Sequence, residues 1–133
     1  MSDAVLDASA ILAVMAAEAR GDVIAAAMAD GARSISAVNV SEIVSKLTDR
    51  GVGSEAIRVS FDDFRLTVHP LDESLALEAG LLRGPTRAAG LSLGDRACLA
   101  LAIRLGLPVI TTDRGWAALE LPVDVIVAHA HPA

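Results

Sequence analysis

Four acidic residues of this 133-residue chain, called the acidic quartet below, could do chemistry together: Asp7, Glu42, Asp95 and Asp113. Asp7 directly follows a short apolar run, and Asp113 follows the β-branched run 109–111, and both runs predict strands. A helix that opens at Ser92 leads into the second of these strands. Because a helix runs opposite to the parallel strand that it feeds, its start and the end of that strand lie at one edge of the sheet. We therefore expect Asp95 and Asp113 to be neighbours in space.

The acidic quartet has the chemistry of a metal site. Four carboxylates at one edge repel one another unless a cation neutralises them. Oxygen ligands without paired His or Cys suit a hard metal, Mg²⁺ or Mn²⁺, and carboxylate-bound Mg²⁺ suits phosphodiester hydrolysis. Taken singly, each acid could instead cap a helix: Asp7 and Asp113 at the N-cap, Glu42 and Asp95 at the third position of a capping box. The joint pattern favours the metal site.

The elements that would position the quartet alternate along the chain. Strands are predicted at 4–6, 34–38, 66–69, 109–111 and 123–127. Helices are predicted at about 9–18, 22–29, 39–50, 55–64, 72–89 with a break at 84–85, and 92–105, followed by a short helical turn around Trp116. This alternation predicts a parallel sheet with helices on both faces, and ligands bind such folds outside the carboxyl ends of the strands. Asp72 and Glu73 are expected at the same edge, farther out.

Composition sets the class of protein. The length favours one domain, and 53% of the residues are hydrophobic although only three are aromatic, which suggests that some apolar surface is covered by a partner. Our candidates for that surface are the first two helices and the helix 55–64, which carries Phe61 and Phe64. No stretch reaches transmembrane length without polar interruption and no signal peptide is apparent, so we expect a cytoplasmic protein without a membrane partner. The single cysteine, Cys98, is interpreted as packing.

The ordered acidic motifs resemble a known family. They are Val5-Leu6-Asp7-Ala8-Ser9, Asn39-Val40-Ser41-Glu42, Leu93-Gly94-Asp95-Arg96 with its Ala/Leu-rich helix, and Val109-Ile110-Thr111-Thr112-Asp113. Together they resemble the PIN-domain ribonucleases, and above all the VapC-type toxins of bacterial toxin–antitoxin pairs. The resemblance covers essentially the whole chain. It implies one PIN-like domain over residues 1–133, with an α/β three-layer fold whose five-stranded parallel sheet carries helices on both faces.

The resemblance also implies an activity. It is that of a Mg²⁺-dependent endoribonuclease, with Mn²⁺ also possible, which works as a homodimer and is inhibited by a cognate antitoxin. The acidic quartet would hold the metal, with Asp7 and Asp95 the firmest ligands, and Ser9 and Thr111 match the positions that support the site. Water activated by the metal would leave 5′-phosphate and 3′-hydroxyl ends. Asn39 stands where Thr or Val is more often expected, which we interpret as affecting the helix cap and not the chemistry.

The formal net charge of −6 argues against broad attraction to nucleic acid, so we expect a structured or sequence-limited RNA substrate. Arg83, Arg87 and Arg114 are the best candidates for phosphate contacts near the acidic edge. Trp116 is interpreted as a core residue rather than a platform for a base. Ser9 is equally consistent with a cap of the first helix, and Thr111 with an ordinary strand residue.

Three alternatives remain open. One is a PIN nuclease that processes RNA without being a toxin. Another is a phosphotransfer or receiver-like domain. A dehalogenase-type phosphatase would need an acid where Ser9 stands. A receiver domain would need a lysine late in the chain, and the single lysine here is Lys46. The last is a non-catalytic interaction domain whose acids only cap helices.

Overall fold

The computed structural model describes residues 3–15 and 31–128, and its strands form one parallel sheet. The strand order is β3-β2-β1-β4-β5, and the bounds are β1 Ala4–Leu6, β2 Arg33–Ser36, β3 Thr67–His69, β4 Val109–Thr111 and β5 Val125–Val127. Every pairing is parallel, with Val5 of β1 opposite Ser34 of β2 on one side and Val109 of β4 on the other. The predicted α/β class with a five-stranded parallel sheet is confirmed.

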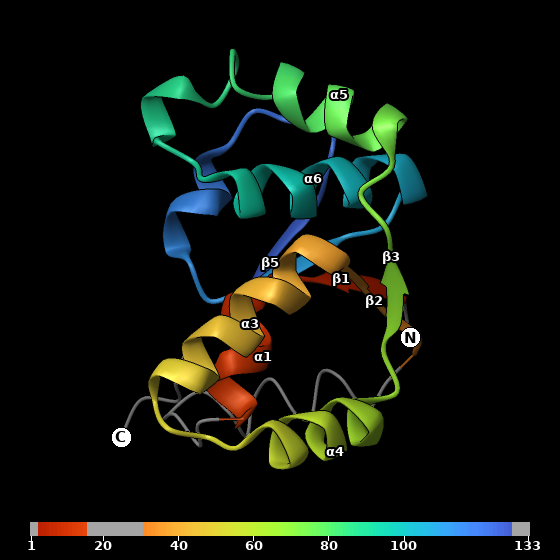
Figure 1. Cartoon of the computed structure of the whole chain (residues 1–133). Helices are drawn as coiled ribbons and strands as arrows, with labels where there is room; N and C mark the ends of the chain where they lie inside the picture. Colours follow the sequence, from red (N-terminus) through yellow and green to blue (C-terminus); the bar gives the residue numbers. More distant parts are fainter. Residues whose placement is uncertain (1–2, 16–30, 129–133) are drawn as a thin grey trace, which may run out of the picture.

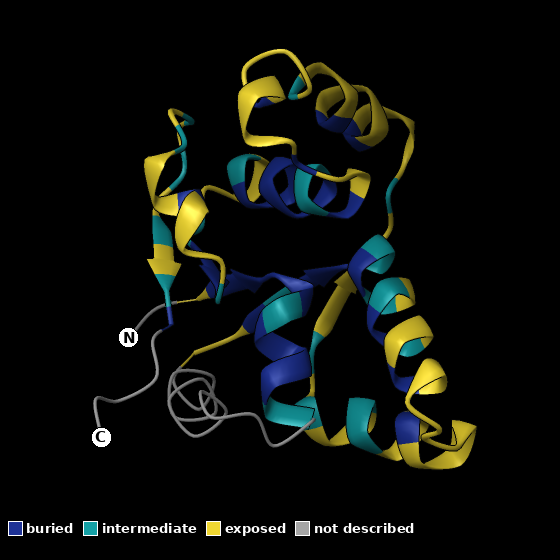
Figure 2. Ribbon diagram, turned by 90° about the vertical axis from the view of Figure 1, so that its left-hand side faces the viewer, coloured by how far each residue is buried: buried dark blue, intermediate teal, exposed yellow. Residues whose placement is uncertain are grey.

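Helices cover both faces of the sheet, as Figures 1 and 2 show. The described helices are α1 Ala8–Met15, α3 Ala37–Asp49, α4 Ser54–Phe64, α5 Glu73–Leu81 and α6 Leu93–Leu105, with short 3-10 helices η1 Arg87–Ala89 and η2 Arg114–Ala118. Alternate side chains of β1 face opposite layers, since Leu6 packs with α1 and α3 while Val5 packs with α5 and α6. The sheet is thus buried between two apolar cores.

Most predicted elements are present, with shifted ends. The second strand stops at Ser36 rather than at residue 38, because the Ser36 side chain accepts a hydrogen bond from the backbone N–H of Val38 and starts α3 two residues earlier than expected. The break at 84–85 separates α5 from η1 as predicted. The predicted helix 22–29 and the last residues of helix 9–18 lie outside the described residues.

Helix α6 is the buried centre of one layer. Its residues 97–102 are all buried, and it ends at Gly106, whose φ of 67° requires the left-handed backbone that glycine tolerates. At 13 residues, α3 and α6 are the longest helices of the described ranges. None of the helices in these ranges combines the length and apolar content needed to cross a bilayer.

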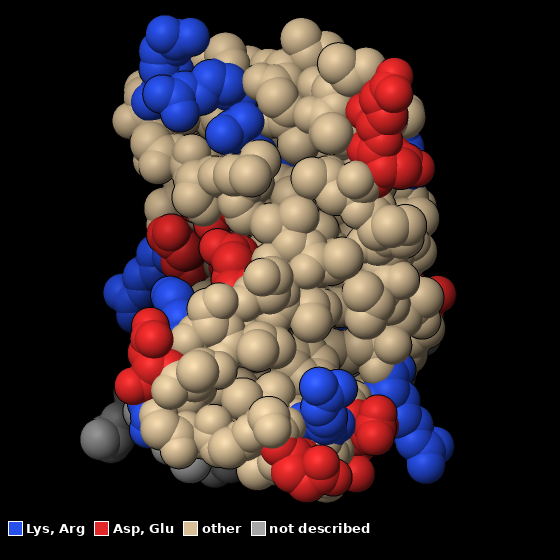
Figure 3. All heavy atoms as spheres, viewed as in Figure 1, with Lys and Arg blue, Asp and Glu red and all other residues tan. Residues whose placement is uncertain are grey.

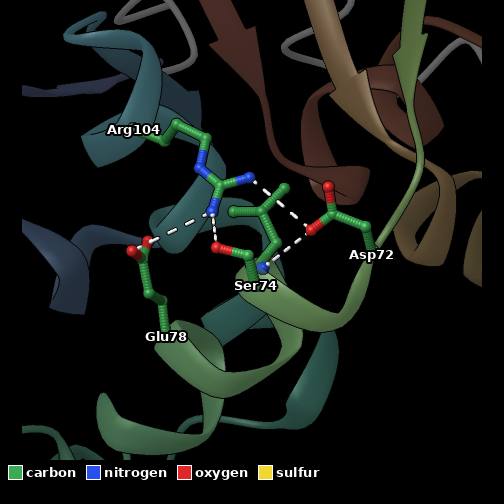
Figure 4. A network of polar contacts seen from close by, with 5 residues as sticks. Asp72, Ser74, Glu78 and Arg104 are labelled. Atoms are coloured by element: carbon green, nitrogen blue, oxygen red, sulfur yellow. Dashed lines mark hydrogen bonds and ion pairs between the residues drawn. The ribbon is translucent and has the colours of Figure 1, made fainter.

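A polar network joins the end of α6 to the start of α5 (Figure 4). Arg104 donates a hydrogen bond of 2.6 Å to Ser74 and lies 3.6 Å from an oxygen of Asp72 and 3.9 Å from Glu78. Asp72 also caps α5 by accepting from the N–H of Leu75. The expectation that Asp72 and Glu73 lie at the edge of the acidic quartet is therefore wrong, since Asp72 and the adjacent start of α5 stand at the opposite end of α6 from Asp95.

Candidate active site

The structure brings the acidic quartet together around one pocket at the carboxyl edge of the sheet. The chain leaves β1 to build β2 and β3 on one side and returns to build β4 and β5 on the other, so the end of β1 is the topological switch point where such sheets bind ligands. Asp7 stands there. The pocket has a volume of about 280 Å³, and its lining residues are Asp7, Ala8, Ser9, Leu12, Glu42, Lys46, Arg50, Asp95, Thr112 and Asp113.

Asp7 is the most deeply placed acid of the quartet. It is 5% exposed, and its Oδ2 atom accepts hydrogen bonds of 2.8 Å from the hydroxyl of Ser9 and 2.8 Å from the hydroxyl of Thr111. Ser9 also accepts from the N–H of Thr112, and Thr111 from the N–H of Asp113. Ser9 and Thr111, the two residues predicted to support the site, therefore connect the end of β4 to the start of α1 through their hydrogen bonds to Asp7.

The surroundings of Asp7 disfavour its charged form. Burial raises the pKa of this carboxyl above its ordinary value, and the charge of nearby Asp95 raises it further. The hydroxyl hydrogen bonds from Ser9 and Thr111 act in the opposite direction, because they stabilise the carboxylate. A cation in the pocket would remove this penalty on ionisation.

Asp95 and Asp113 combine a cap with a place in the pocket. Ser92 and Asp95 form the predicted capping box, in which the Asp95 Oδ2 atom accepts from the N–H of Ser92 at 3.0 Å and the Ser92 hydroxyl accepts from the N–H of Asp95 at 3.2 Å. Asp113 caps η2 by accepting from the N–H of Gly115 at 2.9 Å. Each cap fixes one carboxylate oxygen, so the direction of each side chain is set by its helix.

Glu42 is held by residues that the sequence does not single out for chemistry. Asn39 is not the cap of α3; it lies inside the first turn and is 0% exposed. Its Nδ2 atom donates to Oε1 of Glu42 at 2.8 Å and to the carbonyl oxygen of Gly94 at 3.1 Å. The expectation that Asn39 matters only for the cap is therefore wrong. The spacing of Asn39 and Glu42, three residues apart on one helix face, was the available signal.

The positive charges of the pocket come from α3 and the residue that follows it. Lys46 and Arg50 stand four and eight residues after Glu42, on the same face, and both line the pocket. In Figure 3, acidic and basic atoms meet at the left margin, at the level between α6 and α3. Arg83, Arg87 and Arg114 are exposed but do not line the pocket. A second basic patch in Figure 3 covers the connection between α5 and α6, which carries Arg83 and Arg87.

Cys98 lies directly beneath the acids. It is 0% exposed and its thiol donates to the carbonyl oxygen of Leu6 at 3.7 Å. Burial, followed by the charges of Asp7, Asp95 and Glu42, raises the pKa of this thiol well above its ordinary value. The thiol is therefore neutral and acts as a packing group, as predicted. Trp116, 1% exposed, is likewise part of the core.

The donor set of the pocket fits a hard divalent cation. All four acids offer oxygen, the ligand that Mg²⁺ and Mn²⁺ prefer. Burial and the charge of Asp95 raise the pKa of Asp7, and a bound cation would offset this effect. Within the described ranges, no group of three His, Cys, Asp or Glu side chains lies close enough together to hold a metal ion. The four acids line the pocket. The capping hydrogen bonds of Asp95 and Asp113 hold these two side chains against the N-termini of α6 and η2.

Comparisons with known proteins agree with this architecture. The PIN domain profile matches residues 4–121. No curated protein sequence matches the chain. The fold is similar to VapBC2 of Rickettsia felis bound to a DNA fragment of its promoter, with 14% identity over 96% of this chain and 99% of that chain and a TM-score of 0.72. It is also similar to DNA-bound VapBC of Salmonella typhimurium, with 18% identity, 96% and 98% coverage and a TM-score of 0.70.

A third similar structure is Mycobacterium tuberculosis VapC20, described as a toxin that cleaves the sarcin–ricin loop, with 18% identity, 92% and 99% coverage and a TM-score of 0.69. At these identities the likeness is one of fold. The profile match, in contrast, covers most of the sequence and includes every member of the acidic quartet. The parallel sheet, the pocket at its switch point and this match together place the chain in the PIN-domain family.

Proposed function

We propose that the protein is a divalent-metal-dependent endoribonuclease and the toxin of a toxin–antitoxin pair. The observation that carries the proposal is Asp7, an acid at the switch point that is buried beside Asp95 and hydrogen-bonded to two hydroxyls. Helix capping accounts for Asp95 and Asp113, whereas Asp7 is buried beside Asp95, where burial and that neighbouring charge both disfavour the ionised carboxylate. An acid with a perturbed pKa in a pocket is typical of catalytic sites.

The acidic quartet would hold the metal, Mg²⁺ or Mn²⁺. When bound there, such an ion activates water and neutralises charge on a phosphate. Ser9 and Thr111 keep the Asp7 carboxylate directed into the pocket, and the caps of α6 and η2 direct Asp95 and Asp113. Lys46 and Arg50, on the α3 side of the pocket, would attract and orient the phosphate of the scissile bond.

RNA is the proposed substrate, and its hydrolysis would leave 5′-phosphate and 3′-hydroxyl ends, because water and not the ribose 2′-hydroxyl is the nucleophile. The choice of RNA is supported by the fold shared with VapC20, which is described as a toxin that cleaves the sarcin–ricin loop. The net charge of −6 favours a limited set of RNAs that fit the pocket over general binding to the phosphate backbone.

A protein antitoxin is the proposed partner, since similar structures are toxin–antitoxin complexes. A groove of about 460 Å³ between α3 and α4 offers a place for an antitoxin segment, and its lining residues are Val44, Thr48, Ser54, Ile57, Arg58, Phe61 and Asp62. Phe61 and Phe64 are half-buried against the core of their own subunit, so α4 offers less apolar surface than its sequence suggests.

A Mg²⁺ titration followed by heteronuclear NMR tests the site and separates the enzyme from an interaction domain. Backbone signals at the ends of β1 and β4, around Glu42 in α3 and in the first turn of α6 are expected to shift with saturation. Asp7→Asn should remove this response. A titration that leaves the carboxyl edge of the sheet unchanged would reject the metal site and favour an interaction domain whose acids only cap helices.

A further inference from the structure

We propose that Asn39 and Gly94 are positioning residues that fix the Glu42 carboxylate at the pocket, an inference that rests on the proposed function of the acidic quartet. Asn39 precedes Glu42 by three residues on α3, and its side-chain amide donates both to Glu42 and to the backbone of α6 at Gly94. Because an amide has two N–H groups, it can serve both acceptors at once. A threonine hydroxyl, with one hydrogen, could serve only one of them.

Gly94 completes the arrangement from the other helix. A Cβ atom built at Gly94 would overlap the carboxylate carbon and both oxygens of Glu42. The carboxylate thus lies flat against the backbone of α6, in space that only a glycine leaves open. Gly94 is also buried, and it directly precedes Asp95, the acid that opens the same helix. The N-terminal half of α3 and the first turn of α6 are therefore joined at the pocket through Glu42.

The cost of this arrangement argues against a purely structural role. The Asn39 Oδ1 atom is buried and has no hydrogen-bond partner among the described residues, which is unfavourable for folding. An apolar residue could fill this buried space without leaving an acceptor unpaired. The Asn39 amide instead holds the carboxylate of Glu42, an acid of the quartet. Groups that orient metal ligands are expected in such positions.

Gly94→Ala is the decisive variant, and Gly80→Ala is its matched control. Both substitutions replace a helical glycine by a residue that favours helix, and a Cβ at Gly80 would meet no atom of the described residues within 4 Å. Gly94→Ala is expected to fold, to displace Glu42 and to weaken Mn²⁺ binding about 10- to 100-fold in calorimetry, as loss of an outer-shell partner does. Gly80→Ala should bind Mn²⁺ as the wild type does. Asn39→Ala should weaken binding in the same range.

A double-mutant cycle shows whether Gly94 acts through Glu42. If it does, Glu42→Gln weakens Mn²⁺ binding, and adding Gly94→Ala to that variant weakens it little further. Losses that add in full would overturn the proposal, as would a Gly94→Ala protein with wild-type affinity. A structural effect alone would lower stability without this dependence on Glu42.

The side-chain amide signal of Asn39 gives a readout that does not depend on metal. In ¹H–¹⁵N spectra of the metal-free full chain, this signal should move in Gly94→Ala and in Glu42→Gln but not in Gly80→Ala. An unmoved signal in Gly94→Ala would overturn the positioning role. If the wild type binds no Mn²⁺, the proposed function fails, and the amide signal still decides whether Asn39 and Gly94 hold Glu42.

Discussion

The Asp7 carboxylate occupies surroundings that oppose its own charge. Burial raises its pKa, and the charge of Asp95 adds to the effect. The native state therefore keeps this proton to a higher pH than the unfolded chain does. Without metal, the group lowers the stability of the protein as the pH rises from the unfolded pKa through the raised pKa of Asp7. Below that range both states are protonated and the penalty disappears.

Asp7→Asn is therefore expected to raise the unfolding temperature of the metal-free protein at neutral pH and to reduce RNA cleavage at least about 100-fold. The amide is nearly isosteric, and its oxygen can still accept from Ser9 and Thr111, but it brings no charge into the interior. Trp116, the only tryptophan and fully buried, reports unfolding by fluorescence in chelator. The difference from wild type should vanish at acidic pH. A wild type more stable than the variant at neutral pH would contradict this account of Asp7.

Lys46→Ala is expected to raise KM roughly tenfold with little change in kcat, because a phosphate contact made by an ammonium is worth that much in binding. The salt dependence of binding should weaken by about one phosphate contact. Arg58→Ala is the matched control, since it removes one positive charge from the groove between α3 and α4 instead of from the pocket. Equal effects of the two substitutions on KM would show that only the overall charge matters.

At the scale of elements, local signals predicted the elements that carry the quartet. The capping box of α6 was predicted because Ser92 and Asp95 interact within one turn, and the end of α6 because Gly106 and Pro108 stop a helix. The start of α3 was missed. Ser36 is a good cap, but the β-branched residues after it read as strand, and only packing of α3 on the sheet decides between the two.

Ser92→Ala and Asp95→Asn should separate the two roles of the α6 N-terminus. Ser92→Ala removes the hydroxyl cap and is expected to cost about 1 kcal/mol of stability while RNA cleavage is retained. Asp95→Asn keeps an oxygen that can accept from the N–H of Ser92, so the fold should persist while cleavage falls at least about 100-fold. Urea denaturation and a cleavage assay on both proteins give the comparison. If Ser92→Ala loses cleavage as fully as Asp95→Asn, capping and not catalysis explains Asp95.

At the scale of the whole molecule, topology predicted the site better than any single motif did. Parallel strands end at one edge, so acids from distant segments could be placed together from the sequence alone. The cations could not be placed in the same way, because they depend on how α3 is rotated. Ile43 and Leu47 are buried against the sheet, and this turns Glu42 and Lys46, each one residue earlier, toward the pocket. The spacing of Ile43 and Leu47, four residues apart, is the feature of the sequence that indicates how α3 is rotated.

The homodimer is a prediction that belongs to this scale. The most exposed large apolar side chains of the described residues are Leu77 and Leu81 of α5, at 63% and 76%. Of the helices expected from the sequence to carry the covered apolar surface, α4 exposes Val59 at 50%, while the helix 22–29 lies outside the described residues. We expect α5 to supply the dimer contact, because an apolar pocket of about 250 Å³ lies beside Leu81 between α5 and α6. Light scattering at micromolar concentration should show a dimer, and Leu81→Asp should give a monomer. A monomeric wild type would contradict the prediction, and a dimeric Leu81→Asp would move the contact elsewhere.

Mass spectrometry of RNA cleavage ends tests the central claim most directly, with wild type and Asp95→Asn compared in Mg²⁺ and in chelator. The account predicts fragments with 5′-phosphate and 3′-hydroxyl ends from the wild type in Mg²⁺, and almost none in chelator or from Asp95→Asn. Ends that carry a 2′,3′-cyclic phosphate, or undiminished cleavage by purified Asp95→Asn, would contradict hydrolysis at the acidic quartet.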